Sequence, residues 1–352
     1  MVKRRTGADG MRIGPALMVA AAAIVCFAAV GSMVWNASLP YQGYSEPSVT
    51  VVIEPGKPAR AAALELQQAR VVRSALAFRL LMRLRRAEER VHAGEYEFSG
   101  RMTPDEVLDK LVRGDVVLHK ITVPEGLRAD EVADLLLAAG YGDRASWLGA
   151  TREARLVSDL DPEATDLEGY LFPDTYFLPR GATPDAIVTE MVQRFRKEMT
   201  PARTSRMREL GLNVRQVVTL ASLVEEEAKA DDERPRIAGV FSNRLRNAML
   251  LQCDPTVVYA LVRDNRYRGR IYRSDLEYAS PYNTYIHPGL PPGPISSPGV
   301  RSLEAALYPA QTGELYFVVS GPGRHRFSRT LEDHELAVRR YRQGLDLANR
   351  HR

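Results

Sequence analysis

The stretch Asn213–Ala230 reads NVRQVVTLASLVEEEAKA and has the pattern of an amphipathic helix that begins at Asn213. Asn213 stands three residues before Gln216, a spacing close to that of a capping box, in which both side chains bind backbone N–H groups at the helix start. The apolar residues recur every three or four positions and predict one buried stripe along the helix. That stripe consists of Val214, Val217, Val218, Ala221, Val224 and Ala228.

Three consecutive glutamates near the end of this helix point in different directions, because successive helical residues are about 100° apart. Glu226 falls almost opposite the apolar stripe and is expected to be solvated. Glu225 lies at one edge of the stripe, and Glu227 lies beyond the other edge, in line with Leu220 and Leu223. Partial burial at the edge of a cleft would raise the pKa of either carboxyl and suit a general acid. Helical geometry alone does not separate Glu225 from Glu227. A fully solvated acidic face is the alternative interpretation of the three charges.

Loops dense in aromatic residues, proline and glycine follow one another from Gly169 onward. Sugar rings stack on aromatic faces while their hydroxyls bind polar side chains, so these loops together predict a saccharide cleft. Any one loop considered alone fits equally well a rigid segment packed on the core. The loops are LEGYLFPDTYFLP (167–179), LQCDPTVVY (251–259), SPYNTYIHPGLPPGPISSPG (280–299) and VVSGPGRHRFS (318–328).

Before this region, short strand patterns alternate with helix patterns. VTVVIEPG (49–56) and KITVPEG (120–126) each read as a strand that ends in a turn and leads into a helix. Between them lie a basic helix, the strand GEYEF (94–98) and a helix with a capping-box pair, Thr103 and Glu106. We predict a small module over 49–125 that is similar to the LysM modules which bind N-acetylglucosamine chains. A structural α+β subdomain without ligand contacts is the alternative.

The rest of the chain, 126–352, is predicted to be a larger, mainly helical catalytic domain with short β segments. The fold class is therefore α+β. The second strand-turn-helix unit can belong to either part, which leaves the boundary near Gly126 open.

An uncharged apolar run over 13–35 is long enough to cross a bilayer as one helix. The tail before it, 1–12, carries four basic residues and one acidic residue, which predicts a cytoplasmic N-terminus. A polar linker over 36–48 would then lead to an exported part, anchored by a single pass in the cell (inner) membrane and facing the periplasmic side. A cleaved signal peptide is the competing interpretation, but this run is longer than a typical apolar signal core.

The composition excludes several classes of function. With 48 Lys and Arg against 44 Asp and Glu the formal charge is only +4, and no basic stripe predicts a nucleic-acid partner. One of the two cysteines, Cys26, lies in the predicted membrane helix, so it is not placed to bridge to Cys253. The six histidines are dispersed without an H-E-x-x-H motif. We predict neither a metal nor a cofactor.

Several motifs in order resemble the endolytic murein transglycosylase family, also called MltG or YceG-like. They are ASLVEEEA (221–228), the long run ERPRIAGVFSNRLRNAMLLQCDPTVVYAL (233–261), SPYNTY (280–285), GLPPGPISSPG (289–299) and HRFS (325–328). The resemblance covers roughly Val51 to Tyr341. In that family the catalytic residue is the last glutamate of a Glu-x-Glu pair, which maps onto Glu227. The middle position, often lysine in the family, is Glu226 here.

The same resemblance implies the rest of the site. Asn243 and Arg244 would position loops or substrate, and Glu168 and Asp174 would close one wall; each of these four also suits a purely structural place. The residues expected to line the groove and bind the saccharide are Gln252, Asp254, Thr256, Tyr282, Asn283, Thr284 and Tyr285.

The resemblance implies a lyase reaction with one catalytic carboxylate. Glu227 would protonate the bond between N-acetylmuramic acid and N-acetylglucosamine and leave a 1,6-anhydro end, thereby ending nascent glycan strands. The implied partners are peptidoglycan strands and membrane-bound peptidoglycan synthases. Two rival hypotheses remain: a muramidase that uses water with Asp254 as second carboxylate, and a non-catalytic, membrane-tethered wall-binding scaffold.

Overall fold

The computed structural model describes Ile24, Gly31, Trp35 and residues 38–350, with side chains as far as Gly344. The predicted cytoplasmic tail, and the predicted membrane helix apart from three single positions, lie outside the described residues. Within the part of the chain that is described, no helix combines the length and the hydropathy of a membrane span.

The chain forms two compact units. The first unit runs to Leu118 and includes 179–181, and the second comprises His119–Leu178 and the residues from Ala182 onward. The turn of KITVPEG and the helix after it therefore fold with the larger unit.

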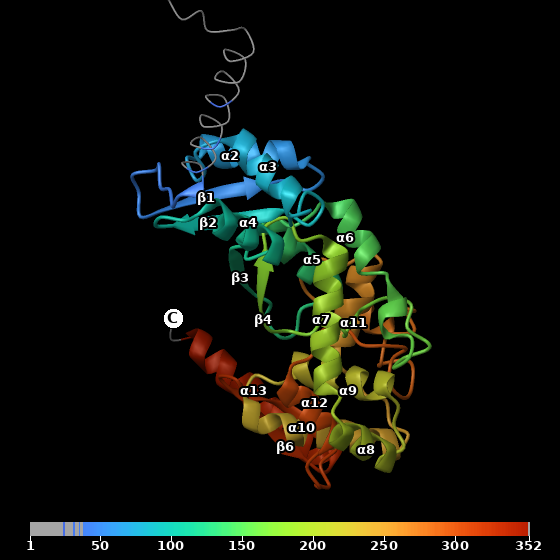
Figure 1. Cartoon of the computed structure of the whole chain (residues 1–352). Helices are drawn as coiled ribbons and strands as arrows, with labels where there is room; N and C mark the ends of the chain where they lie inside the picture. Colours follow the sequence, from blue (N-terminus) through green and yellow to red (C-terminus); the bar gives the residue numbers. More distant parts are fainter. Residues whose placement is uncertain (1–23, 25–30, 32–34, 36–37, 351–352) are drawn as a thin grey trace, which may run out of the picture. The chain divides into compact units, whose positions relative to one another are not determined.

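Between residues 38 and 118 the first unit consists of a two-stranded antiparallel sheet with three helices (Figure 1). Residues on β1 pair with β2 from Ser48↔Ser99 to Ile53↔Gly94. Its core contains Leu66, Phe78, Met82 and Tyr96, each with at most 1% of its surface exposed. The predicted capping box of Thr103 and Glu106 is confirmed. The elements are β1 (Ser48–Ile53), α2 (Ala59–Gln68), α3 (Ala75–Leu84), β2 (Gly94–Ser99) and α4 (Pro104–Arg113).

The second unit is mainly helical, with two small two-stranded sheets, β3 with β4 and β5 with β6. Its helices are α5 (Ala129–Ala138), α6 (Arg144–Ala150), α7 (Pro184–Glu198), α8 (Pro201–Glu209), α9 (Val214–Glu227), α10 (Arg234–Arg246), α11 (Asp254–Arg263), α12 (Val300–Leu307) and α13 (Leu331–Arg350). Short 3-10 turns occur at Ala154–Val157 (η1), Asp231–Glu233 (η2) and Arg273–Glu277 (η3). The strands are β3 (Leu118–Thr122), β4 (Thr175–Pro179), β5 (Tyr316–Gly321) and β6 (Arg324–Ser328). The predicted α+β class, mostly helical with short strands, is confirmed.

Helix α9 packs against α10, α11 and α12 inside this unit. The predicted capping box of Asn213 and Gln216 is confirmed. The prediction of a single buried stripe was too narrow, because every residue from Val217 to Glu225 is buried, including Thr219 and Ser222. Helices cover α9 on several sides, so its polar positions are enclosed as well. Arg215 and Gln216 in the first turn and Glu226 and Glu227 at the end of the helix are half-buried.

Candidate functional site

The three glutamates at the end of α9 have three different environments. Glu225 is buried and forms an ion pair with Arg234, whose Nη1 lies 2.8 Å from Oε1. Its other oxygen accepts a hydrogen bond from the Gly299 backbone N–H at 2.9 Å. Arg234 donates in addition to Ser302 Oγ at 2.5 Å. Glu225 is thus engaged in holding α9, α10 and the start of α12 together.

At Gly299 the backbone lies against the end of the Glu125 side chain, so a larger residue there would displace that side chain. A Cβ at this position would lie 1.8 Å from Glu125 Oε1. Glu125 itself lies 3.8 Å from Arg234 Nη2. The turn that precedes α5 therefore contributes a second carboxylate to the arginine that binds Glu225.

Glu227 is the last residue of α9 and is half-buried. Its Oε1 accepts a hydrogen bond from the thiol of Cys253 at 3.3 Å, and within the described part of the chain it forms no ion pair. Burial, and to a smaller extent the charge of Asp254, raises the pKa of Glu227 to about 7. The same burial raises the pKa of the Cys253 thiol well above its usual range. The thiol therefore stays protonated and donates a hydrogen bond to Glu227. The structure therefore separates Glu227 from Glu225, which helical geometry did not.

Glu226 is half-buried, which corrects the prediction that it is solvated. Burial raises its pKa. Its side chain lines a cavity of about 390 Å³ within the second unit, because the turn before α5 and the start of α11 enclose the end of α9. The other lining residues are Gly126, Leu127, Arg128, Glu131, Asp254, Pro255, Val258, Tyr259 and Ile295.

Arg244 holds the loop that leads to Asp254. Its guanidinium donates to the carbonyls of Leu315, Leu250 and Leu251 at 2.6 to 3.0 Å, and to Gln252 Oε1 at 3.2 Å. Gln252 is exposed, with a left-handed backbone (φ 51°). Arg244 therefore has a structural role, because its hydrogen bonds order this loop.

Asn243 has a similar structural place beside it. Its amide donates to the carbonyls of Thr312 and Glu314 at 2.9 and 2.8 Å. Through these bonds α10 is tied to the segment that leads into β5.

Three of the predicted groove residues are buried beneath the surface. Thr256, Asn283 and Thr284 are at most 1% exposed. The hydroxyls of Thr256 and Thr284 lie 2.9 Å apart, and the Asn283 amide donates to the carbonyls of Leu276 and Tyr278. These contacts use up the polar atoms that a sugar would need. The expectation that these three side chains line the groove is therefore corrected: they brace the loops under it.

Two predicted tyrosines remain half-buried and accessible. The Tyr285 hydroxyl donates a hydrogen bond to Asp254, which is exposed at the first turn of α11. The ring of Tyr282 lies 4.8 Å from that of Tyr259, with the Arg263 guanidinium above its face. Asp254, Tyr282 and Tyr285 thus belong to two loops that the fold brings to one side of α11.

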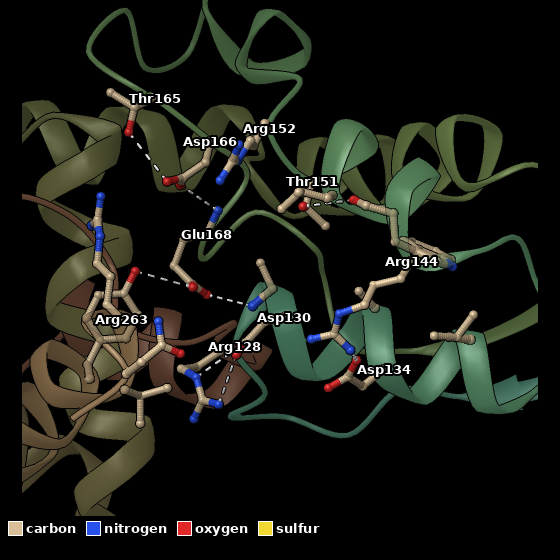
Figure 2. A pocket seen from close by; sticks show the side chains of 18 residues that line it. Arg128, Asp130, Asp134, Arg144, Thr151, Arg152, Thr165, Asp166, Glu168 and Arg263 are labelled. Atoms are coloured by element: carbon tan, nitrogen blue, oxygen red, sulfur yellow. Dashed lines mark hydrogen bonds and ion pairs between the residues drawn. The ribbon is translucent and has the colours of Figure 1, made fainter. Parts of the chain in front are cut away.

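The two predicted wall residues have different places. Glu168 is buried, accepts hydrogen bonds from Ala129 N at 3.0 Å and the Tyr259 hydroxyl at 3.4 Å, and has its pKa raised by burial to about 8. It lines a second cavity (Figure 2). Asp174 instead pairs with Arg194 on α7 at 2.5 Å and lines neither of these two cavities.

Sequence reasoning missed Cys253 and Arg234 as partners of the two glutamates. The only signal for Cys253 was its place directly before Asp254, and Arg234 was one of many scattered arginines. Among the described residues, no three His, Cys, Asp or Glu side chains gather as the ligands of a metal ion would.

Comparison with known proteins agrees with this architecture. The chain is 32% identical to the endolytic murein transglycosylase of Bacillus subtilis (strain 168), over 88% of this chain and 90% of that protein. It is 28% identical to the endolytic murein transglycosylase of Streptococcus pneumoniae (serotype 2, strain D39), over 87% of this chain, and spans 60% of that longer protein. A crystal structure of a yceG-like protein from Listeria monocytogenes superposes with a TM-score of 0.57 at 34% identity, over 83% of this chain and 99% of that one. Residues 51–340 match the profile of the YceG-like family, and the chain belongs to that family.

Proposed function

We propose that this protein is an endolytic murein transglycosylase in which Glu227 is the catalytic acid. The observation that carries the proposal is the environment of one carboxyl, which is half-buried, has a thiol instead of a cation as its partner and has a pKa of about 7. Such a group can donate a proton near neutral pH and take one back. The names of the relatives support murein as the substrate.

The reaction begins when Glu227 protonates the oxygen between N-acetylmuramic acid and the following N-acetylglucosamine. The glycosidic bond breaks through an oxocarbenium-like state. The ionised glutamate then accepts the proton of the muramic acid C6 hydroxyl as that oxygen bonds to C1. The products are a free N-acetylglucosamine end and a 1,6-anhydro end, which would terminate a nascent strand. Because the nucleophile belongs to the substrate, no second catalytic carboxylate is needed and the attack is intramolecular.

Asp254 and Gln252 are the residues that we propose to bind the saccharide beside Glu227, with Tyr282 and Tyr285 as stacking surfaces. The charge of Asp254 contributes to the raised pKa of Glu227, which supports a position of Asp254 near the reacting bond. Its carboxylate accepts from Tyr285, which positions it as a binding group.

For the first unit we propose a LysM-like role in binding N-acetylglucosamine chains. The order strand, helix, helix, strand with one antiparallel pair supports this proposal. Addition of N-acetylglucosamine oligomers to the full-length Glu227→Gln protein should shift NMR signals of residues 48–118. Unchanged signals there, alongside shifts near Glu227, would leave the first unit with a structural role only.

We also propose that residues 13–35 anchor the protein in the inner membrane, with both units on the periplasmic side and synthases as neighbours. The length of the apolar run and the basic residues before it support the proposal. The protein should stay with membranes through alkaline extraction and be digested by protease from the outer face of spheroplasts. Release by alkali would contradict an anchor.

The decisive substitution is Glu227→Gln. It should lower the release of anhydromuramyl ends from purified sacculi by roughly 10²- to 10⁴-fold, because the general acid is lost. Mass spectrometry of the sugar ends measures the effect. Glu226→Gln removes a neighbouring charge from the same turn and should keep most of the activity.

The same experiment separates the rival hypotheses. Reducing ends from the unaltered protein, lost in Asp254→Asn, would mean a muramidase. Glycan binding with no lytic product of either kind would mean a scaffold.

Glu227→Gln should lower the activity but raise the free energy of unfolding at neutral and alkaline pH. The pKa of Glu227 is raised by folding, so the native state holds a proton that the unfolded chain releases above pH 4.5, and stability is lost as the pH rises toward 7. Glu227→Gln should therefore raise the free energy of unfolding above pH 7 by up to roughly 3 kcal/mol, and by nothing below about pH 4. Urea denaturation at both pH values checks this, and equal stabilities would contradict the burial of the charge.

The Cys253 thiol should set the alkaline limit of activity. Its hydrogen bond favours the ionised form of Glu227, so Cys253→Ala should raise the pKa of Glu227 and move the alkaline limb of the pH–rate profile upward. Cys253→Ser keeps a donor and should leave the limb in place or lower it. A profile that is identical in all three proteins would show that the thiol does not contact the reacting carboxyl.

A further inference from the structure

The second unit contains a larger cavity, of about 580 Å³, that the proposed reaction does not use. Its walls are formed by α5, by α6 and the two residues after it, by the segment 165–168, and by the end of α11. Figure 2 shows charged side chains from all four segments directed toward this space. Cavities of this size hold small molecules or short peptides.

Four arginines line the cavity, and two of them form ion pairs. Arg128 pairs with Asp130 at 3.0 Å, and Arg144 pairs with Asp134 at 3.3 Å. In the part of the chain that the structure describes, Arg152 and Arg263 form no ion pair, and both are exposed. The Arg152 guanidinium is therefore available to a carboxylate ligand, and that of Arg263, which lies 5.4 Å from the centre of the Tyr282 ring, is committed to no carboxylate by an ion pair.

The one acid on the buried side of the cavity does not cancel this charge. Glu168 is held by the Ala129 N–H and the Tyr259 hydroxyl, and its pKa of about 8 keeps it mainly protonated at neutral pH. The remaining acids in the lining are Asp130, Asp134 and Asp166. Besides Glu168, the lining therefore holds four arginines and three aspartates.

The uncharged lining is partly polar, through Thr151, Thr165 and Asn265, and partly apolar. Ala129, Ala133 and Leu137 lie on α5, and Leu148 on α6 is 54% exposed. A ligand that suits this cavity carries carboxylates together with small apolar groups.

This cavity is adjacent to the one at the end of α9, because Arg128 and Tyr259 line both. A strand whose sugars lie beside Glu226 and Asp254 would therefore place its substituents within reach of the arginines.

We propose that the 580 Å³ cavity binds the stem peptide of the glycan strand, with Arg152 and Arg263 as the groups that bind its carboxylates. The proposal rests on the proposed function, since it names a further part of the same substrate. Stem peptides hang from the lactyl group of muramic acid and combine carboxylates with alanyl methyl groups, which matches the lining. Bound in this way, the peptide positions the muramic acid whose C1 bond is broken, so the contact contributes to substrate binding.

The test compares glycan strands that carry stem peptides with the same strands after an amidase has removed them. The unaltered full-length protein should show a lower KM for the peptide-bearing strands. Arg152→Gln should raise that KM about fivefold, the effect of one partly exposed ion pair, with kcat unchanged. The same variant should leave the KM for peptide-free strands unaltered. Arg155→Gln is the matched control, because Arg155 is exposed and lies outside the cavity.

Equal KM values for the two kinds of strand, or an equal effect of Arg152→Gln on both, would overturn the proposal. If neither strand yields anhydro ends, the proposed function has failed and the pocket is judged by binding alone. Isothermal titration of a free stem tetrapeptide into the Glu227→Gln protein then decides: binding that weakens in Glu227→Gln/Arg152→Gln supports the pocket, and no binding contradicts it.

Discussion

The buried ion pair of Glu225 with Arg234 is the interaction on which the arrangement of the site depends. It links the last turn of α9 to α10, and through Gly299 it reaches the start of α12. A carboxylate and a guanidinium at 2.8 Å, both almost fully enclosed, satisfy each other's charge. Because this cation is committed to Glu225, Glu227 two residues later is left with a neutral donor. The two carboxyls therefore differ because only Glu225 contacts the arginine, while Glu227 contacts a thiol.

The regular elements were predictable because local patterns determine them. Capping pairs at Thr103 and Asn213, and the alternating strand patterns, appear in the structure where the sequence places them. The environment of α9 was less predictable, since burial of Thr219 and Ser222 depends on helices that are distant in sequence. Periodicity reports which residues are apolar, but it does not report how many neighbours cover the polar ones.

The candidate site was predicted in part for the same reason. Motif resemblance selected Glu227, and the loop of Gln252 and Asp254 does lie beside it. The resemblance did not distinguish exposed groove residues from buried residues that support the loops. Thr256, Asn283 and Thr284 were therefore predicted at the surface although they are buried. For Thr256 and Thr284 a hydrogen bond between segments 28 residues apart decides this, and no local pattern encodes it; Asn283 is held by carbonyls of its own loop.

At Gln252 the backbone conformation and the side-chain contact favour different residues. A φ of 51° suits glycine better than any residue with a side chain, so conformational preference alone would select glycine there. Glycine, however, would remove the amide oxygen that receives the Arg244 guanidinium. Gln252 therefore combines an unfavourable backbone torsion with a side chain that accepts a hydrogen bond from Arg244. Natural variation at this position should accordingly be confined to side chains that accept a hydrogen bond and tolerate this torsion, of which asparagine is the obvious second choice.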